Sequence, residues 1–212
     1  MNFNHLKKII LKLKNKSLPG IDSHIPLVPT ERINVIRNIN DVKNYKIASV
    51  AVLLYPDINN ITRLVLIKRS NYTGTHSGQI AFPGGKYEKS DKSYEETSRR
   101  ETFEEIGVSK SLYNKITNLS KIYIPPSNYM VYPYLFVSNS NLSFTLNKKE
   151  VKSIILPSVD EILNFEVQLG KFEENINPYF HYDNNKIWGA TAMILNEFIY
   201  LMTNKKWDIF VL

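Results

Sequence analysis

The stretch Phe82–Val108 (FPGGKYEKSDKSYEETSRRETFEEIGV) contains the strongest structural and chemical signals in this sequence. It begins with Pro83-Gly84-Gly85, which predicts a turn whose backbone can approach another group closely. Ser93 followed by Glu96 has the spacing of a capping box, which begins helices, and Gly107 is typical of the residue that ends a helix. We therefore expect a glycine turn followed by one helix over residues 93–106.

Three glutamates of this expected helix, Glu101, Glu104 and Glu105, are spaced i, i+3 and i+4 and so share one face. Their charges repel one another, and Arg100 can pair with Glu104 but cannot neutralise all three. A divalent cation can, and oxygen ligands without cysteine or a histidine cluster favour Mg²⁺ or Mn²⁺. These ions act on phosphate oxygens. A solvated acidic helix face is the alternative interpretation, but the turn, the cap, the Arg–Glu pair and the glycine stop together favour the metal site.

Length and composition indicate a folded protein and exclude several classes of site. The chain has 212 residues, of which 43% are hydrophobic and 22% charged, so chain-wide disorder is excluded. It contains no cysteine, which rules out disulfide scaffolds, cysteine-ligated zinc, iron–sulfur clusters and cysteine nucleophiles. No apolar run approaches the roughly 20 residues that span a bilayer, and the N-terminus lacks a secretory pattern. We therefore expect a cytoplasmic protein without stable membrane insertion.

The basic charge is concentrated near the N-terminus. The net charge is +7, and five lysines between Lys7 and Lys16 precede the first acidic residue. A basic balance suggests polyanionic partners, but the rest of the chain is nearly balanced and shows no nucleic-acid-binding module. The sequence therefore favours a small nucleotide substrate over nucleic acid. Residues 3–16 predict an amphipathic helix, for which docking on the domain is favoured over attachment to a membrane surface.

The order of the remaining elements predicts an α+β fold with a mixed sheet between helices. We expect residues 1–30 to form a helical extension and an extended, proline-containing linker, and residues 31–212 to form a single domain. The expected strands are Ile47–Tyr55, Arg63–Lys68, Gln79–Phe82, 120–124, 130–138 and Lys152–Leu156, and a polar stretch over 166–187 suggests a hairpin. The other expected helices are Glu31–Ile39, Val159–Asn164 and Ala190–Asn204.

The same stretch resembles the Nudix box, whose general form is G-x5-E-x7-R-E-U-x-E-E-x-G-U, where U is a bulky apolar residue. The run Arg100–Val108 matches the second half, with Thr102 in place of an apolar residue. In the first half Asp91 stands where glutamate is usual, and eight rather than seven residues separate it from Arg100. The resemblance implies a Nudix-type α/β/α sandwich.

Both departures resemble the coenzyme A diphosphatase branch of that family, whose box is lengthened and carries aspartate. Three further blocks are similar to that branch: 65–85 (VLIKRSNYTGTHSGQIAFPGG), 123–134 (YIPPSNYMVYPY) and 188–195 (WGATAMIL). The resemblance implies hydrolysis of the diphosphate bond of coenzyme A or its thioesters, giving 3′,5′-ADP and 4′-phosphopantetheine or its acyl derivative. The alternatives are another nucleoside diphosphate derivative, such as ADP-ribose or NADH, or a nucleotide sensor without catalysis.

The resemblance also implies roles for individual residues. Glu101 and Glu105 would be the principal ligands of Mg²⁺ or Mn²⁺, and Glu104 a further ligand or the residue that positions water. Gly84 would offer its carbonyl oxygen to the metal. Arg100 would fix a carboxylate. Glu104, Glu105 and Arg100 are thus the expected catalytic residues.

Three cationic or titratable residues and one further glutamate complete the expected site. Lys68, Arg69 and His76 lie in the upstream block and would contact substrate phosphates; the alternatives are a surface pair and a loop-bonded histidine. The general base is expected either within the box or at Glu150, for which a solvated charge is the competing interpretation. The sequence leaves open whether the chain forms a homodimer.

Overall fold

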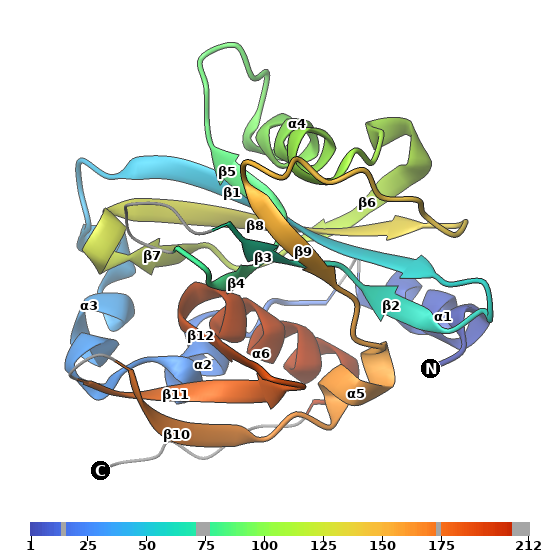
Figure 1. Ribbon diagram of the computed structural model, residues 1–212. Coiled ribbons are helices and arrows are strands. Elements are labelled where there is room, and N and C mark those ends of the chain that lie inside the picture. The colour runs from blue at the N-terminus through green and yellow to red at the C-terminus, as the bar shows by residue number, and fades with distance from the viewer. Residues whose placement is uncertain (14–15, 71–76, 173–174, 205–212) are drawn as a thin grey trace.

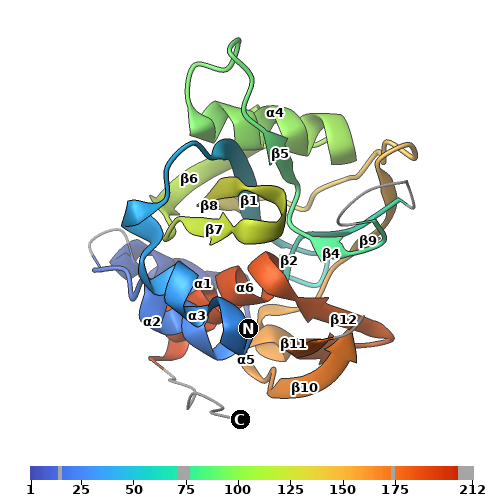
Figure 2. The same ribbon diagram turned by 90° about the vertical axis from the view of Figure 1, so that its left-hand side faces the viewer.

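The computed structural model describes residues 1–13, 16–70, 77–172 and 175–204. A mixed sheet lies between helices: α4 covers one face, and α6 with the N-terminal helices covers the other (Figures 1 and 2). The predicted α+β sandwich is therefore confirmed. The helices are α1 (Phe3–Leu13), α2 (Ile21–His24), α3 (Ile33–Arg37), α4 (Tyr94–Ile106), α5 (Val159–Leu163) and α6 (Gly189–Thr203), with short 3-10 helices at Ile25–Leu27, Thr30–Arg32, Ile39–Asp41, Lys110–Leu112 and Pro125–Ser127.

The main sheet has the strand order β2-β1-β8-β6, with β5 paired to β1 and β7 paired to β8. β1 and β8 run parallel, and the other pairs are antiparallel. Two three-stranded antiparallel sheets, β4-β3-β9 and β10-β11-β12, complete the fold. The strands are β1 (Lys46–Pro56), β2 (Thr62–Leu64), β3 (Leu66–Arg69), β4 (Ile80–Ala81), β5 (Gly84–Lys86), β6 (Tyr113–Asn118), β7 (Ile122–Ile124), β8 (Tyr129–Ser138), β9 (Val151–Ile155), β10 (Val167–Phe172), β11 (Asn175–Tyr182) and β12 (Asn185–Trp188).

Strand β1 supplies side chains to two hydrophobic cores. Ala51 and Leu53 pack with Ile106 at the end of α4, whereas Val52 and Leu54 pack in the core that contains α6. All four β1 side chains are fully buried. A strand buried on both faces forms a continuous apolar run rather than an alternating one, which explains why this strand was predictable.

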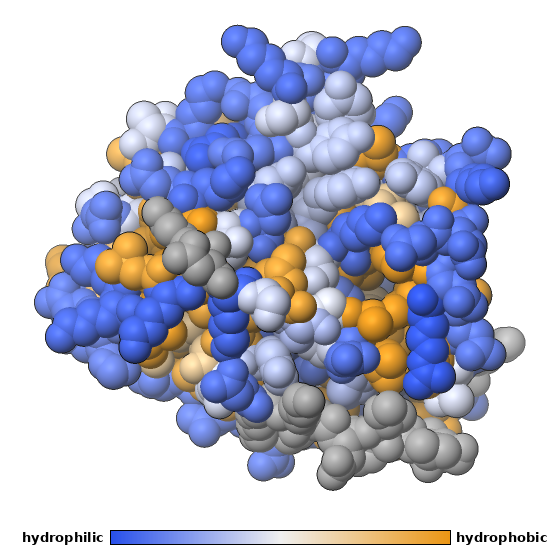
Figure 3. Space-filling model, turned by 180° about the vertical axis from the view of Figure 1, so that it is seen from behind, coloured by the Kyte–Doolittle hydropathy of each residue, from blue (hydrophilic) through white to orange (hydrophobic). Residues whose placement is uncertain are grey.

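The N-terminal helix docks on the domain, as predicted. Phe3, Leu6, Ile10 and Leu13 are buried in the core on the α6 side, and Lys8 on the opposite face is exposed. Seen from behind, the molecule presents mostly hydrophilic side chains, with apolar ones reaching the surface between them (Figure 3). Within the described ranges, no helix has the length and apolar character needed to cross a bilayer.

The expectation of an extended linker over residues 19–30 is wrong. This segment forms α2 and the 3-10 helix Ile25–Leu27, and it packs against α6. The physical reason is a buried polar contact: His24 Nε2 lies 3.0 Å from Glu197 Oε2 of α6. Pro26 occupies the first turn of the 3-10 helix, where its missing N–H leaves no bond unmade.

Two further differences concern strands. The expected strand Arg63–Lys68 is divided at Val65, because β2 pairs with β1 whereas β3 pairs with β4 and β9. The chain thus passes from one sheet to another within a single apolar run. β5 and β6 were not predicted, since a strand that begins Gly84-Gly85 and one that reads YNKITN both lack a strong apolar pattern.

Replacing Glu197 by alanine tests the contact that holds the N-terminal segment. The Glu197 carboxylate is fully buried and accepts hydrogen bonds from the backbone N–H and the hydroxyl of Ser120, in addition to its contact with His24. Removing it leaves the buried imidazole of His24 and the partly buried N–H and hydroxyl of Ser120 without this partner, so we expect a loss of about 3–5 kcal/mol in the free energy of unfolding. Urea denaturation measures this loss.

The control is Glu31→Ala, since Glu31 is exposed and its loss should change the free energy of unfolding by about 0.5 kcal/mol or less. Equal stability of the two variants would contradict the structural role of Glu197.

Candidate active site

The glycine turn allows α4 to lie close to β5. A Cβ atom on Gly84 would lie 2.3 Å from the backbone oxygen of Ser49, and one on Gly85 would lie 2.4 Å from the carboxyl carbon of Glu101. Neither position can therefore carry a side chain without displacing its neighbour. The two glycines bring the Glu101 carboxylate directly against the backbone of β5.

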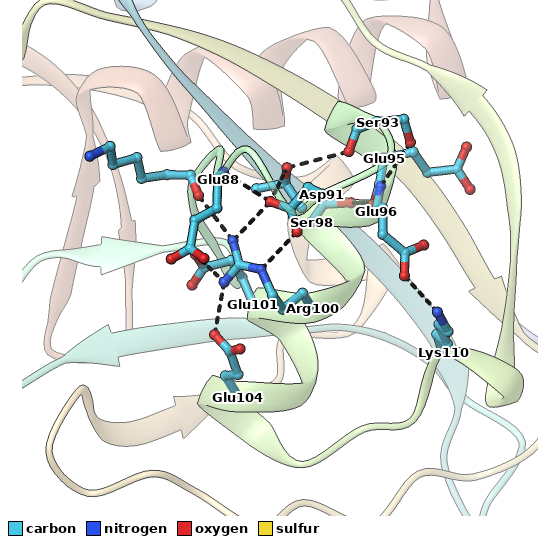
Figure 4. Close-up of polar contacts among 12 residues, drawn as sticks. Glu88, Asp91, Ser93, Glu95, Glu96, Ser98, Arg100, Glu101, Glu104 and Lys110 are labelled. Carbon is cyan, nitrogen blue, oxygen red and sulfur yellow. Dashed lines mark hydrogen bonds and ion pairs between the residues drawn. The ribbon is translucent and has the colours of Figure 1, made fainter.

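The ends of α4 follow the sequence signals in part. The Ser93 hydroxyl oxygen accepts the Glu96 N–H at 3.2 Å, and Gly107 ends the helix in the left-handed conformation with φ 73°. The reciprocal half of the predicted capping box is absent, because the Glu96 carboxylate instead pairs with Lys110 (Figure 4). The helix is nevertheless capped at both ends, which fixes the positions of its glutamates relative to one another.

Arg100 joins the acidic residues around α4 (Figure 4). Its Nε and Nη2 donate to the two carboxylate oxygens of Asp91 at 2.9 and 3.1 Å. Its Nη1 donates to both Glu101 Oε1 at 3.0 Å and Glu104 Oε2 at 2.9 Å, which confirms the predicted Arg100–Glu104 pair. The hydrogen bond from Arg100 is the main reason that the pKa of Asp91 falls to about 2. One guanidinium thus orients three carboxylates.

Glu105 lies at the centre of the site and is 1% exposed. Its Oε2 accepts the Gly84 N–H at 2.9 Å, and its Oε1 lies 3.5 Å from Nη1 of Arg69. Burial is the largest cause of the rise of its pKa to about 8, and the negative charges of Glu101 and Glu150 add to the rise. Burial likewise raises the pKa of Glu101. The positive charge near Glu105 therefore does not offset the cost of burying its carboxylate.

The residues of the upstream block lie on different faces. Successive side chains of β3 alternate, so Arg69 points toward Glu105 on the α4 side, whereas Lys68 donates to Asn185 Oδ1 of β12 at 3.1 Å. The two cations therefore do not converge on one point. His76 lies outside the described residues.

Comparison with known proteins identifies the family to which this chain belongs. The NUDIX domain profile matches residues 46–180, which include the glycine turn, α4 and the residues that contact them. The chain belongs to the Nudix family. A Schizosaccharomyces pombe protein described as a probable Nudix hydrolase is 31% identical over 155 residues, covering 70% of this chain and 54% of that protein. The uncharacterized Nudix hydrolase NudL of Yersinia pestis (strain Pestoides F) is 32% identical over 139 residues, covering 63% and 69%.

A solved structure shows the same fold. The MutT protein of Methanosarcina mazei Go1 superposes with a TM-score of 0.51 at 20% sequence identity, covering 77% of this chain and 98% of that one. The chain spans about half the length (54%) of the S. pombe relative. The comparisons thus establish family and fold, and they name no substrate for this Nudix chain.

The donor set of the Nudix box fits a hard divalent cation. In the described part of the chain, no group of three or more His, Cys, Asp or Glu side chains could hold a metal ion by itself. Mg²⁺ does not require such a cage, because it usually takes one or two carboxylates and completes its shell with water and substrate phosphate. Glu105, which is buried, and Glu101, which is partly buried, are neighbouring carboxylates of raised pKa, and a bound cation would stabilise their charged forms.

The remaining predicted residues are placed as follows. Gly84 contributes its N–H to Glu105, and metal ligation by its carbonyl stays a prediction. Glu104 is about half-exposed and held by Arg100. Sequence reasoning gave no role to Asn147, whose N–H donates to the backbone oxygen of Glu105 at 2.9 Å. The only signal in the sequence was its place before the Lys-Lys-Glu run.

Replacing Glu105 by glutamine should stabilise the metal-free protein in a pH-dependent way. A carboxyl group whose pKa is higher in the folded state than in the unfolded chain contributes stability below the unfolded value, and this is lost as pH rises toward about 8. Glutamine removes that loss. We expect Glu105→Gln to exceed the native protein in free energy of unfolding by about 1–3 kcal/mol at pH 8 and by much less at pH 5.

Urea denaturation in a chelating buffer at a series of pH values measures this difference. A stability difference that does not change between pH 5 and pH 8 would show that Glu105 is not titrating in the folded protein.

Proposed function

We propose that this Nudix chain hydrolyses the diphosphate bond of coenzyme A or its thioesters, using Mg²⁺ or Mn²⁺, to give 3′,5′-ADP and 4′-phosphopantetheine or its acyl derivative. The observation that carries the hydrolytic part is the pair of neighbouring carboxylates, buried Glu105 and partly buried Glu101, beside Gly84 and Gly85. Such a pair needs a cation, and the glycines let the Glu101 carboxylate lie directly against the backbone of β5.

The choice of coenzyme A rests on the sequence. The lengthened box with Asp91 and the blocks at 65–85, 123–134 and 188–195 are similar to the coenzyme A diphosphatase branch. In the fold, Asp91 makes a bidentate pair with Arg100, so the departure from the usual box has a structural function here. An aspartate that accepts from Nε and Nη2 of Arg100 leaves Nη1 for Glu101 and Glu104.

In this proposal each residue of the box has a separate role. Glu101 and Glu105 would hold the metal, and Arg100 keeps Glu101 and Glu104 in place. When bound, a divalent ion neutralises charge that develops on a diphosphate and activates water for attack. The Gly84 N–H fixes the orientation of the Glu105 carboxylate. Arg69 faces the same carboxylate, and in this proposal its guanidinium would contact a phosphate oxygen of the substrate.

Two alternative functions differ in whether they require the metal-binding carboxylates. Hydrolysis of ADP-ribose or NADH would use the same carboxylates, so only a substrate comparison separates it from the leading proposal. A nucleotide sensor does not need metal carboxylates, and this chain retains all three box glutamates. That retention favours an enzyme over a sensor.

A substrate panel with Mg²⁺ or Mn²⁺ tests the proposal. The purified chain should convert coenzyme A into two phosphorylated products whose masses are those of 3′,5′-ADP and 4′-phosphopantetheine. Glu105→Gln should lower kcat/KM by about 100-fold or more, because it removes a charge that acts on the transition state through the metal. It should also abolish the rise in melting temperature that Mn²⁺ produces in the native protein.

The matched control is Glu166→Gln, which makes the same chemical change at an exposed residue and should leave both readouts unchanged. Cleavage of ADP-ribose or NADH without cleavage of coenzyme A would refute the substrate assignment. Nucleotide binding without turnover of any substrate, at every metal tested, would favour the sensor.

A further inference from the structure

A cavity of about 260 Å³ lies between the N-terminal segment and the start of β7, on the side of the sheet away from α4 (Figure 2). Its walls come from α2, α3, the 3-10 helix Ile39–Asp41 and residues 120–122. The described residues that line it include none of the Nudix box, so the cavity is separate from the site described above. Four isoleucine side chains line it: Ile21, Ile36, Ile39 and Ile122.

His24 supplies the most deeply buried polar group of this cavity. Its side chain is 3% exposed, lines the cavity and has its Nε2 3.0 Å from Oε2 of Glu197. The Glu197 carboxylate also accepts the N–H and the hydroxyl of Ser120. Since an ionised carboxylate only accepts hydrogen bonds, Nε2 is the donor in the contact with His24. Glu197 thereby fixes the orientation of the ring.

The second ring nitrogen of His24, Nδ1, is without a partner among the described residues. A polar atom in such a buried position costs free energy, because it has lost water and gained no hydrogen bond in exchange. A group inside the cavity that hydrogen-bonds to Nδ1 would supply the missing contact. Ligand sites commonly combine apolar walls with one or a few polar groups of this kind.

Lys121 adds positive charge to the same cavity. It lines the cavity and is exposed, and its ammonium group pairs with no carboxylate among the described residues. Neither aspartate nor glutamate is found among the described residues of the lining. The charge of the lining is therefore complementary to a negatively charged group.

We propose that this cavity binds a small soluble alkyl carboxylate. The hydrocarbon chain would lie among the isoleucines, where it is removed from water, and the carboxylate would lie between His24 Nδ1 and Lys121. The volume of about 260 Å³ corresponds to about nine groups the size of a water molecule, at roughly 30 Å³ each. Hexanoate, with about eight non-hydrogen atoms, matches that size. This inference goes beyond the proposed function and does not depend on it.

The charges of the occupied cavity balance. A ring with hydrogen on both nitrogens donates to Glu197 through Nε2 and to the ligand through Nδ1. Two carboxylates then face one imidazolium and the ammonium group of Lys121. A neutral alcohol would leave Lys121 without a partner, and an alkylamine would bring a second positive charge beside it. The carboxylate is therefore favoured over both.

Titration calorimetry in a chelating buffer tests the ligand class on the native chain, with hexanoate, hexanol and hexylamine as probes. We expect hexanoate to bind with a Kd on the order of 1 mM or below. Hexanol and hexylamine should bind at least about tenfold more weakly, because neither forms the charged hydrogen bond to His24.

Three variants test the location. In His24→Gln the amide nitrogen can still donate to Glu197, but no group replaces Nδ1, so affinity for hexanoate should fall at least about tenfold with little change in melting temperature. Ile39→Phe should abolish binding because the larger ring fills the cavity. Lys121→Gln should weaken binding about two- to fivefold. The matched control is Lys8→Gln, an exposed lysine outside the cavity, which should bind as the native chain does.

Nitrogen-15 NMR of the histidine rings reports the contact directly. Hexanoate should shift the Nδ1 signal of His24, which is assigned by its absence in His24→Gln. An unchanged Nδ1 signal at saturating hexanoate would contradict the inference. This readout also separates a ligand contact from a histidine whose only function is to hold the N-terminal segment to Glu197.

The remaining outcomes are equally decisive. Absence of hexanoate binding to the native chain would overturn the inference, and so would native affinity in Ile39→Phe, since the molecule would then lie elsewhere. Equal affinity for hexanol would overturn the negatively charged ligand. Glu105→Gln should bind hexanoate as the native chain does, and a loss there would place the carboxylate in the Nudix box instead. If His24→Gln does not fold, Ile39→Phe decides. Failure to cleave coenzyme A would refute the proposed function and leave this inference standing.

Discussion

The site is organised around a buried carboxylate with too little compensation. Glu105 is 1% exposed, and its close contacts are one backbone N–H and a guanidinium nitrogen at 3.5 Å. Burying an ionised carboxylate is costly unless it is paired and hydrogen-bonded, and the pKa of about 8 expresses that cost. The surrounding structure keeps Glu105 in this position, so the fold carries a local destabilisation that a cation would remove.

The elements around Glu105 each contribute to that arrangement. β1 is buried on both faces and anchors the sheet, and β5 pairs with it through glycines that admit no side chain. The bare backbone of β5 lets α4 approach until the Gly84 N–H reaches Glu105. Arg100 then holds the two neighbouring glutamates of the same helix, Glu101 and Glu104. The sheet, the glycine turn and the helix together determine the position and the burial of the Glu105 carboxylate.

The sequence predicted the elements whose signals are local and missed those that depend on tertiary contacts. α4 was predictable because Ser93 and Gly107 mark its ends within the helix itself. α2 was missed because a buried contact with Glu197, far away in the sequence, overrides the extended bias of the nearby prolines. β5 was missed because a glycine strand has no apolar pattern, and its pairing with β1 is visible only in the fold.

The same distinction applies to the site residues. The Arg100–Glu104 pair follows from helical spacing and could be predicted. The separation of Lys68 from Arg69 follows from strand alternation, which required knowing where β3 begins. The link between Asn147 and Glu105 joins a loop to a helix about forty residues apart in the sequence, and no spacing rule reveals it.

Two buried glutamates in this chain show the difference between a structural and a functional carboxylate. Glu197 is fully buried and receives the N–H and the hydroxyl of Ser120 and the contact with His24. Glu105 is buried almost as deeply but receives one backbone N–H, from Gly84, and a longer contact of 3.5 Å from Nη1 of Arg69. The fold is therefore able to satisfy a buried carboxylate with three donors, and does so where the carboxylate holds segments together. Beside the glycine turn the carboxylate of Glu105 has fewer donors, and carboxylate oxygens are the ligands that a hard divalent cation prefers.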